Sequence, residues 1–234
     1  MFTCCMPSRV IELRIAGVVF ALLAVLFVAF PEIDLATSGH FYKDGRWAFS
    51  DGNWPLFELL YRGTPRAGQV LLIILTGGLL LGTFKRLPWL QARRTTLGFL
   101  LAAALLGPVL LVDATLKDGW HRARPTTVTE FGGPLKFTPA FMLSDQCVKN
   151  CSFVSGHVAT AAFVMAFGWL ATPAVRRRWL LTSLATASLL ALVRLTAGGH
   201  FLSDTLFAWF ATYFSLWLTE WIFRRLKWLP PVTD

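Results

Sequence analysis

Charged residues are scarce in this chain of 234 residues: Asp, Glu, Lys and Arg together account for 15% of it, whereas hydrophobic residues account for 55%. Soluble domains carry about 25% charged residues, so the composition excludes an ordinary soluble domain and indicates a protein that crosses the membrane several times. Low-complexity linkers and internal repeats are also lacking. The length therefore indicates a single membrane-embedded domain over residues 1–234.

A signal-peptide cleavage site is missing as well. Arg9 and Arg14 precede the first apolar run, but no small-residue cleavage motif follows that run. We therefore interpret it as a retained first membrane span.

Acidic residues are outnumbered, 13 against 22 Lys and Arg, which gives a net charge of +9. In a soluble protein this excess would suggest nucleic-acid binding. Here the basic residues lie mostly beside apolar runs, so membrane orientation explains them better and no nucleic-acid partner is expected.

Six segments come close to the roughly 20 apolar residues that a spanning helix needs. They cover about 12–30, 67–84, 97–115, 156–172, 179–196 and 205–223. The predicted fold is thus an all-α bundle of six transmembrane helices, some of them short.

The basic residues predict how this bundle is oriented. With the N-terminus inside, the inner segments hold 12 basic and three acidic residues, whereas the outer segments hold ten of each. The inner basic residues are Arg9, Arg14, Lys85, Arg86, Arg93, Arg94, Arg176, Arg177, Arg178, Arg224, Arg225 and Lys227. Because cytoplasmic segments carry the excess of Lys and Arg, both termini are predicted to lie inside.

This orientation brings three polar islands to the outer ends of the predicted spans, at 117–125, 155–157 and 194–204. A further outer stretch, 47–66, is amphipathic, with Trp54, Phe57 and Tyr61 on one stripe. It is interpreted either as a surface helix in the headgroup region or as a wall for a lipid substrate.

The first island supplies cations. Lys117 and Arg124 are seven residues apart, which on a helix places them on nearly the same face. Arg194, at the end of the fifth predicted span, is a third cation. Any one of them could simply anchor a span end, but three together would repel each other unless an anion binds between them, and Arg and Lys both bind phosphate.

The other two islands supply histidines. Ser155 can cap the helix that follows, Gly156 allows an anion close to the backbone, and His157 could protonate a leaving oxygen. His200 and Asp204 are four residues apart, which on a helix would face the carboxylate toward the imidazole. Each feature alone also has a purely structural interpretation, as a helix cap or as a pair that satisfies itself.

The combination is more specific. Lys-x6-Arg-Pro, then Ser-Gly-His, then Arg-x5-His-x3-Asp resembles the three-part signature of the type 2 phosphatidic acid phosphatase superfamily. The resemblance implies that His200 is the nucleophile, Asp204 its orienting partner and His157 the general acid. It also implies that Lys117, Arg124, Ser155, Gly156 and Arg194 bind the substrate phosphate, and that no metal or other cofactor is needed.

Two positions depart from the usual family pattern. Val154 stands where Pro usually precedes Ser-Gly-His, and Val193 stands where Ser usually precedes the arginine. Neither change deletes a catalytic group, so we expect weakened rather than absent activity.

The outer loop 126–155 is the best candidate for specificity. Its Cys147 and Cys151 could form a local disulfide in an oxidising space, or remain two free thiols because so short a loop would strain the bond. A zinc site there is not expected, since His157 is the one further ligand close in sequence and it has a stronger role.

The tract from Phe131 to His157 also resembles, more loosely, bacterial lipid A phosphatases of the same superfamily. This implies a lipid A phosphate as substrate, with undecaprenyl diphosphate and phosphatidylglycerol phosphate as alternatives, and no obligatory protein partner. It implies a bacterial inner-membrane protein whose active site faces the periplasm. A protein that binds or transports phosphate lipids without cleaving them is the alternative from another class, although it would not require a second histidine beside the His200/Asp204 pair.

Overall fold

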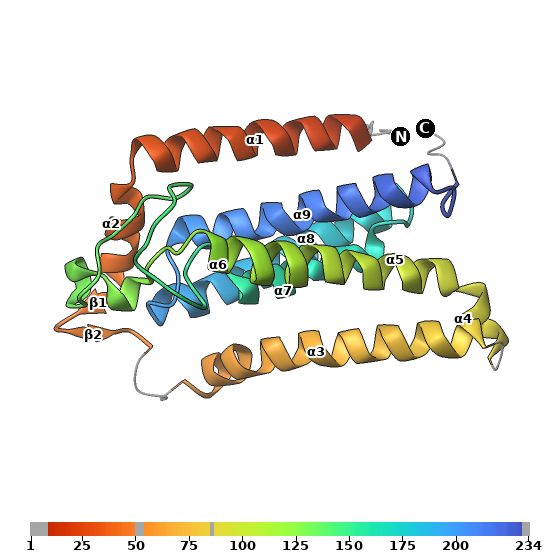
Figure 1. Cartoon of the computed structure of the whole chain (residues 1–234), viewed down its shortest axis with the longest axis horizontal. Helices are drawn as coiled ribbons and strands as arrows, with labels where there is room; N and C mark the ends of the chain where they lie inside the picture. Colours follow the sequence, from red (N-terminus) through yellow and green to blue (C-terminus); the bar gives the residue numbers. More distant parts are fainter. Residues whose placement is uncertain (1–8, 50–53, 85–86, 231–234) are drawn as a thin grey trace, which may run out of the picture.

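The computed structural model describes residues 9–49, 54–84 and 87–230, and most of them lie in long helices packed side by side (Figure 1). The long helices are α1 (Arg9–Ala29), α3 (Pro55–Thr83), α5 (Arg94–Ala104) continued by the π-helix η1 (Leu105–Leu116), α8 (Pro173–Thr196) and α9 (Leu202–Arg225). The short helices are α2 (Glu32–His40), α4 (Pro88–Ala92), α6 (Lys117–Gly119), η2 (Pro125–Thr127), η3 (Thr129–Phe131), α7 (Gly156–Ala162) and η4 (Phe163–Gly168). Strands β1 (Tyr42–Lys43) and β2 (Arg46–Trp47) form one small antiparallel hairpin.

Four helices in the described part of the chain are long and apolar enough to cross a membrane. They are Arg9–Ala29, Pro55–Thr83, the continuous helix Arg94–Gly119 and Pro173–Thr196. They correspond to four of the six predicted spans and support an all-α membrane protein.

The other two predicted spans are helical but differ from the prediction. The expected span 156–172 is a shorter apolar helix, Gly156–Gly168. The expected span 205–223 lies in α9, which has 24 residues but is not among these four helices. Its polar residues are buried because α9 lies at the centre of the bundle, where 13 of its side chains are enclosed by other helices.

The amphipathic stretch 47–66 is not a separate surface helix. From Pro55 onward it is the first part of α3, which continues without interruption to Thr83 and contains Pro65. Pro65 leaves the carbonyl of Tyr61 without its helical donor, and this carbonyl accepts from Nε2 of His157 at 2.9 Å instead.

The two ends of the bundle differ in chemistry. At one end α1 begins and α9 ends, and Arg9 is bonded to Glu220 there. At the other end lie α2, the β-hairpin, α6 and the loop that leads to α7 (Figure 1). All three polar islands belong to this second end, as predicted from their places at the ends of the spans. Lys85, Arg86 and Asp234, which entered the charge count, lie outside the described residues.

Candidate active site

The three polar islands are bonded to one another through the backbone. The N–H of Ser155 donates to the carbonyl of Asp204 at 3.1 Å, and the N–H of Thr126, just after the first island, donates to the carbonyl of Gly198 at 3.1 Å. Segments more than 70 residues apart in sequence therefore form one site.

His200 lies in a turn before α9, and not on the helix as its spacing from Asp204 suggested. The chain leaves α8 at Thr196 and turns at Gly198, where φ is +61°. A Cβ atom on Gly199 would lie 2.3 Å from Nη2 of Arg194. Both glycines are thus required, one by backbone conformation and the other by close approach of the guanidinium.

The imidazole of His200 is oriented mainly by a backbone carbonyl. Its Nδ1 donates to the carbonyl of Ser152 at 2.8 Å, whereas Nδ1 and Oδ2 of Asp204 are 3.7 Å apart. Oδ2 of Asp204 accepts from the Ser152 hydroxyl at 2.6 Å and from the Phe201 N–H at 2.8 Å. Asp204 therefore reaches His200 chiefly through Ser152, and this tautomer leaves the lone pair on Nε2.

Burial keeps His200 neutral. The side chain is 1% exposed, and this burial lowers its pKa well below the usual value of 6.5. The charges of Arg194, Arg124 and Lys117 lower the pKa further. All three predicted phosphate-binding cations thus act on the candidate nucleophile, which remains uncharged at neutral pH.

Arg194 is a buried cation with little to neutralise it. Its side chain is 2% exposed, and its guanidinium lies 4.6 Å from the centre of the Tyr61 ring. Within the described residues its Nε has no hydrogen-bond partner and no carboxylate lies within 4.0 Å of the guanidinium. A buried cation of this kind is costly unless an anion pairs with it.

Arg124 does not lie on the helix that carries Lys117, which differs from the prediction. The helix ends at Gly119, the chain turns at His121 with a φ of +52°, and Arg124 is extended, so Lys117 and Arg124 do not share a helix face. The Arg124 guanidinium donates to the Asn150 carbonyl at 2.7 and 3.0 Å and to the Asn150 side-chain oxygen at 2.9 Å. Burial, and then the charge of Arg194, lower the pKa of Arg124 to about 10, as expected for a buried cation near a second cation.

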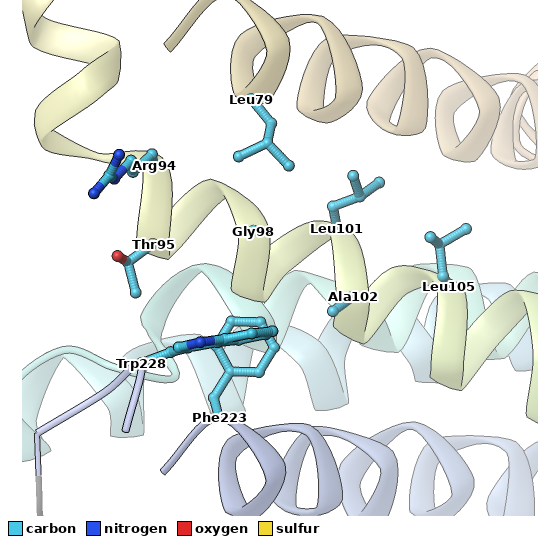
Figure 2. A pocket seen from close by; sticks show the side chains of 9 residues that line it. All are labelled: Leu79, Arg94, Thr95, Gly98, Leu101, Ala102, Leu105, Phe223 and Trp228. Atoms are coloured by element: carbon cyan, nitrogen blue, oxygen red, sulfur yellow. The ribbon is translucent and has the colours of Figure 1, made fainter. Parts of the chain in front are cut away.

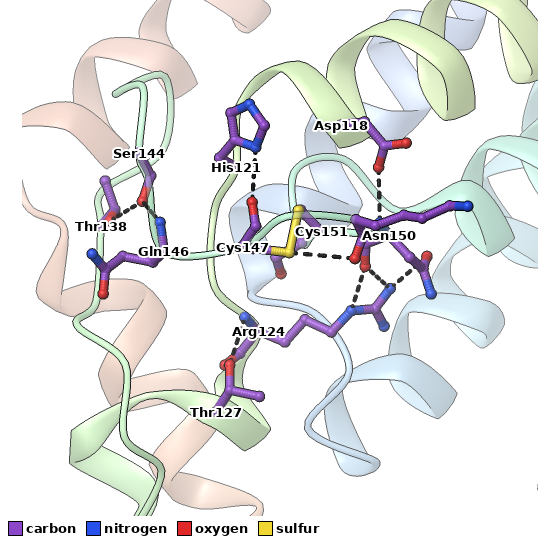
Figure 3. The surroundings of a disulfide bond; sticks show 12 residues. Asp118, His121, Arg124, Thr127, Thr138, Ser144, Gln146, Cys147, Asn150 and Cys151 are labelled. Carbon is purple, nitrogen blue, oxygen red and sulfur yellow. Dashed lines mark hydrogen bonds between the residues drawn. A yellow bond between two sulfur atoms is a disulfide. The ribbon is translucent and has the colours of Figure 1, made fainter.

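The loop that holds Arg124 is closed by a disulfide between Cys147 and Cys151, one of the two interpretations left open by the sequence (Figure 3). The N–H of Asn150 donates to the Asp118 carboxylate at 2.8 Å, and His121 donates to the Cys147 carbonyl at 2.8 Å. The first island is thus bonded to this loop at three points.

The second island stands beside Lys117. Nζ of Lys117 donates to Asp113 at 3.0 Å, and a Cβ on Gly156 would lie 3.2 Å from the same Nζ and 2.6 Å from Oδ1 of Asp113. The Ser155 hydroxyl accepts from the Val158 N–H at 3.5 Å and caps α7, as its position predicted. Nε2 of His157 donates to the Tyr61 carbonyl at 2.9 Å, and so Tyr61 contacts both His157 and Arg194.

A cavity of about 230 Å³ opens beside this island. It is lined by Lys117, Gly156 and His157 and continues along apolar side chains of α3, η1 and η4, among them Leu72 and Val109. Another cavity, of about 420 Å³, lies near the opposite end of the bundle, between α3, α5 and α9 (Figure 2). Apart from Arg94 and Thr95 its lining is apolar, and it contains none of the candidate residues.

Several residues outside the predicted catalytic and phosphate-binding set complete the site. Ser152, Asn150 and Tyr61 orient the candidate residues, mostly through backbone carbonyls, which no side-chain pattern reports. Arg122 and Asp34 are fully buried and bonded to each other at 2.8 Å. Arg122 lies two residues before Arg124 and could have been noticed, whereas Asp34 carries no sequence signal.

Comparison with known proteins identifies relatives. A lipid A 4'-phosphatase of Francisella tularensis subsp. novicida strain U112 is 33% identical over 221 residues, which cover 91% of this chain and 96% of the relative. Lipid A 4'-phosphatases of Rhizobium etli and Rhizobium leguminosarum are 35% and 36% identical, each over 82% of this chain and over 79% and 88% of the relative. No solved structure matches the chain. The family model described as PAP2 superfamily matches residues 95–228, which contain all three islands, and the chain therefore belongs to the PAP2 superfamily.

Proposed function

We propose that this protein is a phosphatase that removes the 4'-phosphate of lipid A in the outer leaflet of a bacterial inner membrane. The names of its relatives support this substrate. The observation that carries the proposal is Arg194, a buried guanidinium beside His200 that lacks a carboxylate partner within the described part of the chain. A phosphate group supplies the anion that this cation requires.

In the proposed mechanism Nε2 of His200 attacks the phosphorus atom and the sugar oxygen leaves, which forms a phosphohistidine. Lys117, Arg124 and Arg194 stabilise the negative charge on the phosphoryl oxygens. Nε2–H of His157 donates to the Tyr61 carbonyl, so the imidazolium form of His157, which also carries a proton on Nδ1, gives that Nδ1 proton to the leaving oxygen. Water then attacks the phosphohistidine and releases inorganic phosphate, and His157 takes up the proton from that water.

The cavity beside Lys117 and His157 supports a lipid as the substrate. Its polar end lies at the site, and most of its apolar side chains belong to α3 and η1, which are parts of helices long and apolar enough to lie in the bilayer. The phosphorylated headgroup would bind at the polar end while acyl chains stay beside these helices.

The proposal includes six spans with both termini in the cytoplasm and the site in the periplasm. The excess of basic residues at one end of the bundle supports this orientation. The disulfide at the other end supports an oxidising space there.

The experiment is phosphate release by purified protein from lipid A that carries phosphate at position 1, at position 4' or at both. Undecaprenyl diphosphate and phosphatidylglycerol phosphate serve as competing substrates. We expect release from the 4' position, abolished by His200→Ala and unchanged by the control His40→Ala, which alters a histidine on α2 outside the site. Turnover by a folded His200→Ala variant would contradict the nucleophile, and preference for another lipid would contradict the substrate.

A further inference from the structure

Beneath the candidate nucleophile lies a buried cluster of three charged side chains. Asp34, Arg122 and Asp204 are each 0% exposed. Nη2 of Arg122 donates to Asp34 at 2.8 Å, and its Nη1 donates to Asp204 at 2.6 Å. One guanidinium therefore bridges two carboxylates that come from the two ends of the chain.

Arg122 has no freedom to move within this cluster. Its Nε donates to the carbonyl of Thr138 at 2.7 Å, and its Nη1 also donates to the hydroxyl of Ser203 at 2.9 Å. The guanidinium lies 4.4 Å from the centre of the Phe201 ring, and this contact orients its plane. Arg122 thus holds Asp204 in one geometry.

Asp34 in turn holds Arg122 and the start of α9. Its Oδ1 accepts from the Ser203 N–H at 2.9 Å, and its Oδ2 accepts from the Ser203 hydroxyl at 2.5 Å. The Asp34 carboxylate therefore bonds directly to the residue that precedes Asp204.

The cluster continues to the reacting imidazole. Asp204 accepts from the Ser152 hydroxyl at 2.6 Å, and the Ser152 carbonyl accepts from Nδ1 of His200 at 2.8 Å. The series of hydrogen bonds from Asp34 to His200 is unbroken: Asp34, Arg122, Asp204, Ser152, His200.

Asp34 is contributed by α2, the short helix that follows the first span. The family model matches residues 95–228, which include every other member of this series but not α2. Buried ionic clusters of this type add little net stability, because desolvation offsets the attraction between the charges. A role in geometry explains such a cluster better than a role in stability.

We propose that Asp34 and Arg122 are positioning residues for the phosphatase reaction, which act on His200 through Asp204 and Ser152. This inference rests on the proposed function. It assigns to α2 a part in catalysis although none of its residues is expected to touch the substrate. Because Lys117, Arg124 and Arg194 do not depend on the cluster, loss of Asp34 should slow the chemical step without weakening phosphate binding.

The test is steady-state phosphate release by Asp34→Asn, which keeps the shape of the side chain but removes its charge. Displacement of a reacting group by about 1 Å costs on the order of 100-fold in rate, so we expect kcat per folded molecule to fall about 10- to 100-fold. KM should stay within about two-fold of wild type. In an Arg122→Gln background, adding Asp34→Asn should cause less loss than it causes alone, because both residues act on His200 through Asp204.

Ser38→Ala is the matched control. Ser38 lies one turn further along α2, is 1% exposed, and its hydroxyl has no hydrogen-bond partner within the described residues, so kcat should not change. If Asp34→Asn does not fold, Ser203→Ala replaces it, since this change removes a hydroxyl bonded to both Asp34 and Arg122 without altering any charge. A several-fold loss of kcat at constant KM is then expected.

Three results would overturn the inference: wild-type kcat in folded Asp34→Asn, wild-type kcat in Ser203→Ala where that variant is used, or fully additive losses in the double variant. An unchanged kcat, with the whole loss of kcat/KM explained by a higher KM, would also contradict it. Failure of the wild-type protein to release phosphate from any of the lipids would instead refute the proposed function, so the two failures are distinct.

Discussion

The side chains of the candidate site are held by backbone carbonyls more than by one another. Ser152 accepts from His200, Tyr61 accepts from His157, and Asn150 accepts from Arg124. A carbonyl oxygen cannot donate a proton, so each of these bonds requires a donor on the side chain and fixes which imidazole nitrogen carries hydrogen. The tautomers of both histidines are therefore independent of the protonation of neighbouring acids.

At the residue scale we predict that His200 stays neutral at pH 6.5. Its pKa in the folded protein lies well below 6.5 because of burial and the three nearby cations, whereas the unfolded chain titrates near 6.5. As the pH falls below 6.5 the unfolded state therefore binds this proton first, and the contribution of His200 to folding stability declines. NMR of labelled histidine checks this, because the chain has four histidines that single substitutions can assign.

His40, on α2 outside the site, serves as an internal comparison in the same spectra. Titration of the His200 imidazole at or above pH 6.5 in the folded protein would contradict the prediction.

At the scale of elements, the disulfide loop 147–151 supports Arg124, one of the proposed phosphate-binding residues. Asn150, within this loop, has a φ of +55° and directs both its carbonyl and its side-chain oxygen to Arg124. Asparagine adopts this backbone conformation more readily than most residues. The loop therefore orients a cation that the sequence motif names but does not position.

We predict that Cys147→Ser weakens phosphate binding more than it slows the reaction. Without the disulfide the loop loses its closure, Asn150 no longer holds Arg124, and KM should rise by about 10-fold, equivalent to about 1.4 kcal/mol. His200 and Ser152 are bonded independently of the disulfide, so kcat should fall less than three-fold, by about 0.6 kcal/mol or less. Steady-state kinetics measures both, and a loss confined to kcat would show that the loop does not act through Arg124.

A second element-scale feature is the attachment of α1 at the other end of the bundle. Most of α1 is exposed on its outer face, with Leu22 65% and Val25 67% exposed, as expected of a helix surrounded by lipid. Glu220, 2% exposed, accepts from Arg9 at 2.7 Å, from Arg224 at 2.7 Å and from Nε1 of Trp169 at 2.7 Å. One carboxylate thus joins α1, α9 and the end of η4.

Glu220→Ala should therefore destabilise the bundle. It removes the shared acceptor of two partly buried guanidinium groups and one indole, and loss of one partner of a buried ion pair costs about 3 kcal/mol. Thermal unfolding in detergent micelles, followed by tryptophan fluorescence, measures the loss. The exposed Glu32→Ala on α2 is the control and should change stability by less than about 0.5 kcal/mol. Equal melting temperatures for the two variants would contradict the assigned role of Glu220.

At the scale of the whole molecule, chemistry is divided between the ends of the bundle. The candidate phosphate site and the disulfide belong to segments that lie with the β-hairpin at one end of the bundle, and the cluster around Glu220 belongs to the end where α9 terminates (Figure 1). This division suits a protein that works on one face of a membrane and is anchored at the opposite face.

The predicted orientation can be tested by cysteine labelling of intact cells with a membrane-impermeant thiol reagent. In a background without Cys4 and Cys5, Lys136→Cys should react from outside, because Lys136 is exposed in the loop that carries the disulfide. Arg178→Cys, exposed on the first part of α8, should react once the membrane is permeabilised. The reverse pattern would contradict both the orientation and a periplasmic active site.

The sequence alone determined the chemical identity of the site. Apolar run length predicted the helices, and the fixed spacings of the three islands predicted which cations and histidines would gather at one end. These features are local: hydrophobicity acts over a single helix, and each island is shorter than 12 residues. Four of the six predicted spans are long and apolar enough to cross a membrane in the described part of the chain, and the six-span arrangement stays a prediction.

The tertiary structure alone decided how these residues are held. Helical spacing suggested a direct His200–Asp204 contact and a shared face for Lys117 and Arg124, but a turn and an extended segment replace the helix at both places. The bond between Asp34 and Arg122 joins residues 88 positions apart, and that between Arg9 and Glu220 joins residues 211 apart. No local pattern encodes such pairs, because they exist solely when packing of the apolar helices brings distant charges into one buried space where each must find a partner.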